Sequence, residues 1–160
     1  MKLRYAVVGA GAIGGYYGGK LAMSGCDVHF LYHSDFEWVK NHGLRVDSVK
    51  GDFFLRTINA YGDPADMPSC DVALVCLKST QNHLLPELLK PILHEGTMVV
   101  LIQNGLGLEQ QLARSLTSQP IAGGMAFICA SRVSAGYIRH MDYGSLTVGA
   151  YQNVEGGILK

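Results

Sequence analysis

The fold is decided by residues 3–14, which read LRYAVVGAGAIG. Residues 3–8 form a short, mostly apolar run that ends at a glycine, and a run of this kind predicts a buried strand. The glycines at positions 9, 11 and 14 then form a GxGxxG motif. Residues 12–24 carry one apolar helical stripe and are followed by Gly25 as a predicted C-cap, so they predict a helix.

A GxGxxG motif between a strand and a helix is typical of a dinucleotide-binding turn. The first glycine permits the tight turn, the second lets backbone N–H groups approach a pyrophosphate, and the third lets the helix pack closely on the strand. Free N–H groups and the helix dipole favour an anion at this point. Gly15, Gly18 and Gly19 weaken the helix intrinsically, and we expect close backbone packing to compensate. The candidate cofactor contacts of the turn are Gly9, Ala10, Gly11, Ala12, Ile13 and Gly14.

Further along the chain, apolar runs alternate with helical stripes, which indicates a parallel sheet covered by helices. The strands are predicted at 28–32, 71–77, 97–102 and 121–127, and the helical stripes at 84–92 and 108–116. Two pairs of short apolar runs flank turn-forming residues, at 50–52 and at 142–144. We therefore predict an α/β fold with a Rossmann-type, doubly wound, mostly parallel sheet, helices on both faces and two antiparallel additions.

Length and composition narrow the class of protein. The chain has 160 residues, the usual size of one domain, and 48% of them are apolar. Thirteen basic and thirteen acidic residues cancel, so bulk charge favours neither nucleic acid nor a membrane surface. The first apolar run is too brief for a signal peptide or a membrane span, and we expect a cytoplasmic protein. The cysteines form no CxxC pair, and we predict reduced, structural thiols and no metal site.

The end of the second predicted strand bears on the choice of cofactor. An acid about 20 residues beyond the glycines would accept hydrogen bonds from the ribose 2′-hydroxyl of NAD. His33 and Ser34 stand there instead, and they can donate to a 2′-phosphate that a carboxylate would repel. The local chemistry favours NADP. Asp35 and Glu37 lie just beyond, so NAD remains an alternative cofactor. The alternative interpretation of His33 is an exposed loop residue without a role in binding.

Two polar residues follow apolar strands where ligands bind in this class of fold. Lys78 ends the run 71–77, and Asn104 follows the run 99–103. In a doubly wound sheet, ligands bind outside the carboxyl ends of the strands near the topological switch point, which would bring both residues to one crevice with the glycine turn. An ammonium can bind anionic parts of a cofactor or substrate, and an amide both donates and accepts. Taken singly, a solvated lysine and a turn residue are the more ordinary interpretations.

Four segments together resemble the ketopantoate reductase family: Gly9–Gly14, Leu77-Lys78, Gln103–Gly107 and Gly136–His140. The resemblance extends over essentially the whole chain. It implies NADPH-dependent reduction of 2-dehydropantoate to pantoate, in pantothenate and coenzyme A synthesis, with a small keto acid as the partner. Family members often have arginine near His33, and this departure bears on the strength of the NADP preference.

The resemblance also implies roles for individual residues. The glycine turn and Ala130 match cofactor contacts of the family. Lys78 matches the lysine at the cofactor and substrate cleft, and Asn104 matches the asparagine that contacts the nicotinamide ribose and the substrate.

The family also has a helical second domain, which carries the catalytic lysine and most substrate contacts. We expect residues 1–160 to be one NAD(P)-binding Rossmann domain without that second domain, without a catalytic residue and inactive by itself. The segment 156–160 shows no closing element, which we interpret as an interruption. The alternatives are a free-standing nucleotide-binding module and the cofactor half of a related 2-keto acid reductase. Apolar surface left by the absent domain should favour association, as a homo-oligomer or with a separate chain.

Overall fold

The structure is a computed structural model that describes residues 2–153. The segment 156–160, interpreted from sequence as an interruption, lies outside the described residues. The elements along the described chain are β1 (Arg4–Val8), α1 (Ala12–Met23), β2 (Asp27–Leu31), α2 (Phe36–His42), β3 (Leu44–Ser48), β4 (Phe53–Leu55), β5 (Asn59–Tyr61), η1 (Pro64–Asp66), β6 (Val72–Val75), η2 (Ser79–Leu84), α3 (Leu85–Leu89), β7 (Met98–Leu101), α4 (Leu108–Ala113), β8 (Ile121–Ser134) and β9 (Tyr137–Gln152).

The strands form one 9-stranded sheet in the order β4-β3-β9-β8-β7-β6-β1-β2-β5. The part β5-β2-β1-β6-β7-β8 is parallel throughout. Numbered along the chain, these strands have the order 3-2-1-4-5-6 of a dinucleotide-binding sheet, with the topological switch point between β1 and β6. The predicted α/β class and the mostly parallel sheet are confirmed.

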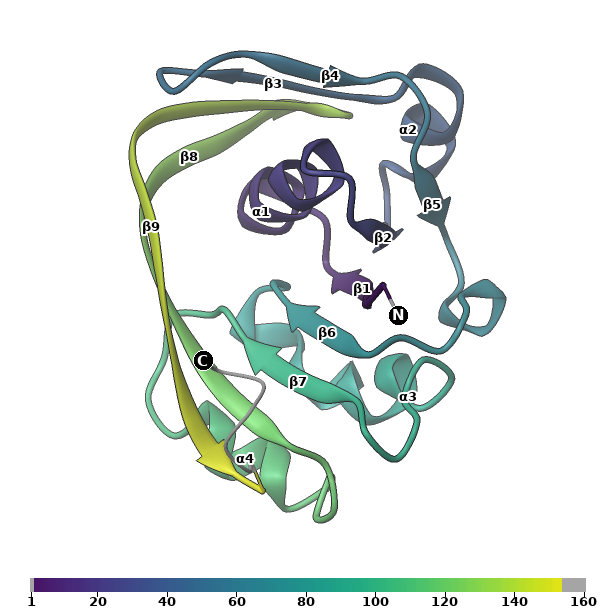
Figure 1. The fold of residues 1–160 in the computed structure, drawn as a ribbon, viewed down its shortest axis with the longest axis vertical. Coiled ribbons are helices and arrows are strands. Elements are labelled where there is room, and N and C mark those ends of the chain that lie inside the picture. Colours follow the sequence, from purple (N-terminus) through teal and green to yellow (C-terminus); the bar gives the residue numbers. More distant parts are fainter. Residues whose placement is uncertain (1, 154–160) are drawn as a thin grey trace.

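Helices cover both faces of the sheet, as predicted. Successive side chains of a strand point to opposite faces, and β1 accordingly places Val7 in one apolar core and Ala6 and Val8 in another. The first core contains residues of α1, and the second contains residues of α3 and α4. Figure 1 shows α1 inside the curl of the sheet and α3 and α4 on the other side.

Helix α1 is packed tightly inside this curl, which confirms the expectation for its glycines. A Cβ at Gly18 would lie 2.6 Å from the Phe30 ring of β2, and a Cβ at Gly19 would lie 2.7 Å from the Phe53 ring of β4. The helix ends at the predicted cap: the Gly25 N–H donates to the Ala22 carbonyl, and the Cys26 N–H donates to the Leu21 carbonyl. This pair of hydrogen bonds is a Schellman motif.

The two later helical stripes form shorter helices than the sequence predicts. Residues 84–92 contain the end of the 3₁₀ segment η2 and only the short helix α3, because Pro86 stands at its start and Pro91 cannot continue it. The stripe at 108–116 forms α4, which ends at Ala113.

Of the two predicted antiparallel additions, the first is confirmed. For the second, the predicted position of the turn is wrong. Strand β3 pairs antiparallel with β4. At 142–144, however, β9 runs on without reversing, and the turn lies at Ala135-Gly136 between the antiparallel strands β8 and β9. Tyr143 and Gly144 have φ values of 61° and 111°, and the register with β8 shifts beside them. Residues that favour a turn here form a β-bulge, which bends the strand.

The long β8–β9 ribbon closes the curl. Strand β8 starts parallel to β7 at Ile121, and β9 starts parallel to β3 at Tyr137. The ribbon therefore runs from one part of the sheet to the other, past α1, as Figure 1 shows. This path brings the far end of β8 to the carboxyl end of β2.

Candidate cofactor-binding site

Three loops leave neighbouring parallel strands at one edge of the sheet. The glycine turn follows β1, Leu77-Lys78 follows β6, and Gln103-Asn104 follows β7. Strand β6 lies between β1 and β7. The carboxyl ends of parallel strands share an edge, so this topology places the three loops side by side, as the sequence predicts.

The glycine turn needs glycine at two positions for reasons internal to the protein. Gly9 has a φ of 90°, and a Cβ there would lie 2.6 Å from the Leu77 backbone nitrogen. A Cβ at Gly14 would meet the Gly9 carbonyl and would lie 2.8 Å from Val7 Cγ1. The turn thus lies against the loop after β6, and the helix lies against β1.

Gly11 is different from these two glycines. It has a negative φ of −81°, and no described atom lies within 4 Å of the position that its Cβ would take, chain neighbours aside. Packing therefore does not call for glycine here. The open space beside the Gly11 backbone fits a ligand that approaches the main chain closely, such as a pyrophosphate.

The N-terminus of α1 lies at the same point and has no side-chain cap. Gly11 is its N-cap residue, and its first turn contains no acidic residue. The first helical hydrogen bond is donated by the Gly15 N–H to the Gly11 carbonyl, over 2.8 Å. The preceding N–H groups have no helical acceptor, so they are available to an anion.

A hollow of about 340 Å³ lies over this turn, and we call it the turn hollow. Its lining residues are Gly9, Ala10, Gly11, Ala12, Ile13, Tyr32, His33, Ser34, Asp35, Cys76, Leu77, Lys78 and Arg132. His33 and Lys78 are exposed within the described chain, and no carboxylate of that chain forms an ion pair with Lys78. Burial raises the pKa of the Cys76 thiol to about 12, so this cysteine stays protonated and is no nucleophile.

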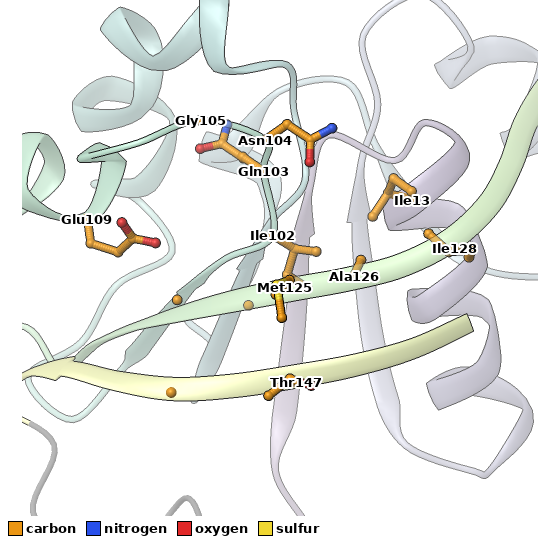
Figure 2. A pocket seen from close by; sticks show the side chains of 13 residues that line it. Ile13, Ile102, Gln103, Asn104, Gly105, Glu109, Met125, Ala126, Ile128 and Thr147 are labelled. Carbon is orange, nitrogen blue, oxygen red and sulfur yellow. The ribbon is translucent and has the colours of Figure 1, made fainter. Parts of the chain in front are cut away.

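A second hollow of about 530 Å³ contains Asn104, and we call it the Asn104 hollow (Figure 2). It lies between the loop after β7 and the ribbon, with Glu109 of α4 at one end and Ile13 at the other. Ile13 lines both hollows, so they adjoin at the start of α1. Lys78 and Asn104 therefore lie in neighbouring hollows and not in a single crevice.

A side-chain network joins the loops that carry these two residues. The Gln103 Nε2 donates to the Leu77 carbonyl and to Asn82 Oδ1, each over 2.7 Å, and Asn82 Nδ2 donates back to Gln103 Oε1 over 3.1 Å. The residue before Asn104 is thus tied to the residue before Lys78. Sequence reasoning did not identify Asn82, which lies in η2 and carries no motif.

Ala130 lines neither hollow. It lies in β8 and pairs with His140 of β9. Its neighbours two residues away, Ile128 and Arg132, line the Asn104 hollow and the turn hollow respectively. The predicted cofactor contact at Ala130 is therefore placed on the strand between the two hollows.

An ion pair that sequence reasoning missed stands at the end of β2. Arg132 Nε donates to Asp35 Oδ2 over 2.7 Å, and Arg132 Nη2 donates to Asp35 Oδ1 over 2.6 Å. The hydrogen bonds from Arg132 hold the pKa of Asp35 below its ordinary value. The partners are 97 positions apart in sequence, and no local pattern links them.

The chain is similar in sequence and in fold to known ketopantoate reductases. The sequence model of the family described as ketopantoate reductase PanE/ApbA matches residues 5–153. A 2-dehydropantoate 2-reductase of Nostoc sp. is 54% identical over 92% of this chain and 46% of the relative, and one of Halobacterium salinarum is 30% identical over 94% and 50%. The crystal structure of a 2-dehydropantoate 2-reductase from Geobacter metallireducens superposes with a TM-score of 0.90 at 41% identity, over 96% of this chain and 51% of that one.

This chain spans about half the length of the curated relatives it matches. In residues 2–153, no helix is long and apolar enough to cross a membrane. The same residues contain no group of three or more His, Cys, Asp or Glu side chains placed to hold a metal ion.

Proposed function

The chain belongs to the ketopantoate reductase family of oxidoreductases, and we propose that it is the cofactor-binding half of an enzyme that reduces 2-dehydropantoate to pantoate with NADPH. The observation that carries the proposal is the open space beside Gly11, between the uncapped N-terminus of α1 and Lys78. Protein packing does not account for a glycine at that position, whereas the approach of a dinucleotide pyrophosphate does.

The residues of the two hollows suit the parts of such a cofactor. The N–H groups at the start of α1 bind the pyrophosphate, and Lys78 adds a positive charge at the same edge. His33, just after β2, donates a hydrogen bond to the 2′-phosphate, with Ser34 beside it. The adjoining Asn104 hollow is then the place for the nicotinamide ribose and the keto acid, with the Asn104 amide as donor and acceptor. When bound, NADPH supplies the hydride.

Ketone reduction also needs a proton donor and stabilisation of the developing oxyanion. In the Asn104 hollow, the ionisable lining residue of the described chain is Glu109, a carboxylate that supplies no positive charge. We propose that a helical second half, beyond the length matched here, brings the catalytic groups to the open side of this hollow. The cytoplasmic location expected from the sequence is part of the same proposal.

Calorimetric titration of the 160-residue chain with NADPH and with NADH tests this function. We expect NADPH to bind more tightly than NADH. The Gly11→Ala variant should lose about 10-fold or more in NADPH affinity, because the new methyl group occupies the place of the pyrophosphate, while its thermal midpoint stays within about 2 °C of the parent. The matched control is Gly96→Ala, which adds a methyl group in the turn before β7, at an ordinary 3.5 Å from His94.

Three results would contradict the proposal. Tighter binding of NADH would overturn the assignment of NADPH as the cofactor. Binding of neither nucleotide would overturn the assignment of the glycine turn as the binding site. Steady turnover of 2-dehydropantoate by the 160-residue chain alone would show that this half needs no further catalytic groups.

A further inference from the structure

Arg132 brings a guanidinium to the end of β2 from a distant strand. The residue lies in β8, and the curl of the sheet carries this strand to the turn hollow. There it lines the same hollow as His33 and Ser34. The segment directly after β2 contains no arginine of its own, so the positive charge at this place is supplied across the fold.

The geometry of the ion pair leaves part of the guanidinium available. Asp35 is 7% exposed and accepts from Nε and Nη2 of Arg132. Nη1 of Arg132 makes no hydrogen bond in the described chain, and 45% of the arginine side chain is exposed. Arginine carries its donors in a rigid planar fork, so the carboxylate on one edge fixes the direction of the others.

The place of this pair in the fold gives it a specific ligand. In dinucleotide-binding sheets, an acid at the end of the second strand accepts from the ribose 2′-hydroxyl of NAD, whereas an arginine nearby accommodates the 2′-phosphate of NADP. Asp35 lies just beyond the position of that acid, directly after His33 and Ser34, and is the first carboxylate after β2. Both of its carboxylate oxygens are already engaged by Arg132, and Oδ1 also accepts from the Ser34 hydroxyl.

We propose that Arg132 binds the 2′-phosphate of NADP, and that Asp35 is a positioning residue that holds the guanidinium for this contact. The proposal rests on the proposed function, because it assigns the cofactor selectivity of the same site. Asp35, a carboxylate that could otherwise accept from the 2′-hydroxyl of NAD, is thereby paired with Arg132 and holds that guanidinium for the 2′-phosphate of NADP. His33 completes the contact as a donor, and the Ser34 hydroxyl, which donates to Asp35 Oδ1, helps to hold the carboxylate in place.

Binding of adenosine 2′,5′-bisphosphate and of AMP isolates the 2′-phosphate from the rest of the cofactor. We expect Arg132→Gln to weaken the bisphosphate about 10- to 100-fold, the usual value of one or two hydrogen bonds to a charged group, and to change AMP binding by less than about 2-fold. The matched control is Arg45→Gln. Arg45 makes the same two-pronged contact with Asp47, over 2.8 and 2.9 Å, but lies on β3 outside both hollows.

Two further variants test the positioning role and guard against misfolding. Arg132→Lys keeps the charge without the fork and should retain part of the preference for the bisphosphate. Asp35→Asn should weaken the bisphosphate about 3- to 10-fold, and the double variant Asp35→Asn, Arg132→Gln should be no weaker than Arg132→Gln alone, because the two residues act through one contact.

The outcomes separate this inference from the proposed function. If the parent chain prefers the bisphosphate but Arg132→Gln keeps that preference, or loses affinity for both ligands equally, Arg132 does not read the phosphate and the proposed function stands. A loss of AMP affinity in Asp35→Asn would mean that Asp35 reads the 2′-hydroxyl, and would overturn the assignment. A parent chain without preference for the bisphosphate overturns both proposals.

Discussion

At the scale of single residues, the ion pair of Asp35 couples stability to pH. The hydrogen bonds from Arg132 hold the pKa of Asp35 below its ordinary value of 3.8. A carboxyl whose folded pKa is lowered contributes stability that is complete above the unfolded pKa and is lost as the pH falls through the folded pKa. We therefore expect Asp35→Asn to lower the free energy of unfolding by about 1 kcal/mol near pH 6, a modest value because Arg132 is partly exposed.

Urea unfolding at a series of pH values measures this effect. The difference between the parent and Asp35→Asn should begin to shrink near pH 3.8, where the carboxyl of the unfolded chain becomes neutral, and should be lost below the lower pKa of the folded state. A difference that stays constant from pH 6 to pH 3 would show that Asp35 stabilises the fold by its shape and not by its charge.

Single residues also show what sequence can and cannot predict about the site. The order of strand, glycines and helix predicts Gly9, Gly11 and Gly14, because their roles depend on the chain immediately around them. The structure adds that packing requires the first and third of these and not the second. Arg132 could not be predicted, because its partner lies 97 positions away and only the curl of the sheet brings them together.

At the scale of elements, α1 is closely constrained by its surroundings. Strands β1 and β2 contact it at Gly18, and β4 contacts it at Gly19. Glycine in a helix costs about 1 kcal/mol relative to alanine, so an exposed helical glycine is improved by that exchange. Inside this curl the same exchange should destabilise the fold, because the methyl group of alanine has no room.

We expect Gly18→Ala to destabilise the fold by about 1–3 kcal/mol, the usual cost of overpacking. The new Cβ would lie 2.6 Å from the Phe30 ring and 2.7 Å from Val7 Cγ2, and both residues are fully buried. Thermal unfolding beside Gly96→Ala measures the difference. A Gly18→Ala variant as stable as the parent would show that Phe30 moves aside freely and that the helix is packed loosely.

Elements differ in how well sequence predicts them. The parallel strands β1, β2, β6 and β7 were predictable because both faces are covered, which gives continuous apolar runs. The β-bulge at 142–144 was not predictable, because a turn and a β-bulge favour the same residues. Only the pairing of the strand with its neighbour decides between them. Here β8 continues alongside, so the chain bends and does not reverse.

At the scale of the whole molecule, the ribbon that closes the curl has an apolar outer face. Met125, Phe127 and Cys129 alternate along β8 and are all exposed. Tyr143 of β9 packs on Phe127, with ring centroids 4.3 Å apart, and the two side chains are 51% and 60% exposed. We call these residues the outer face of the ribbon. An apolar group of this kind on an exposed strand pair favours association.

We expect the 160-residue chain to self-associate through this outer face, because water-exposed apolar side chains are buried when two copies meet. Sedimentation velocity over a range of concentrations measures the association. The variant Phe127→Ser, Tyr143→Ser should shift it toward monomer by about 10-fold or more in dissociation constant, because two large apolar side chains leave the contact. The control Val49→Ser removes an apolar side chain that is 67% exposed in the β3–β4 turn, and should change nothing. A parent chain that stays monomeric at high concentration would mean that the outer face is tolerated in water, and would contradict the expected association.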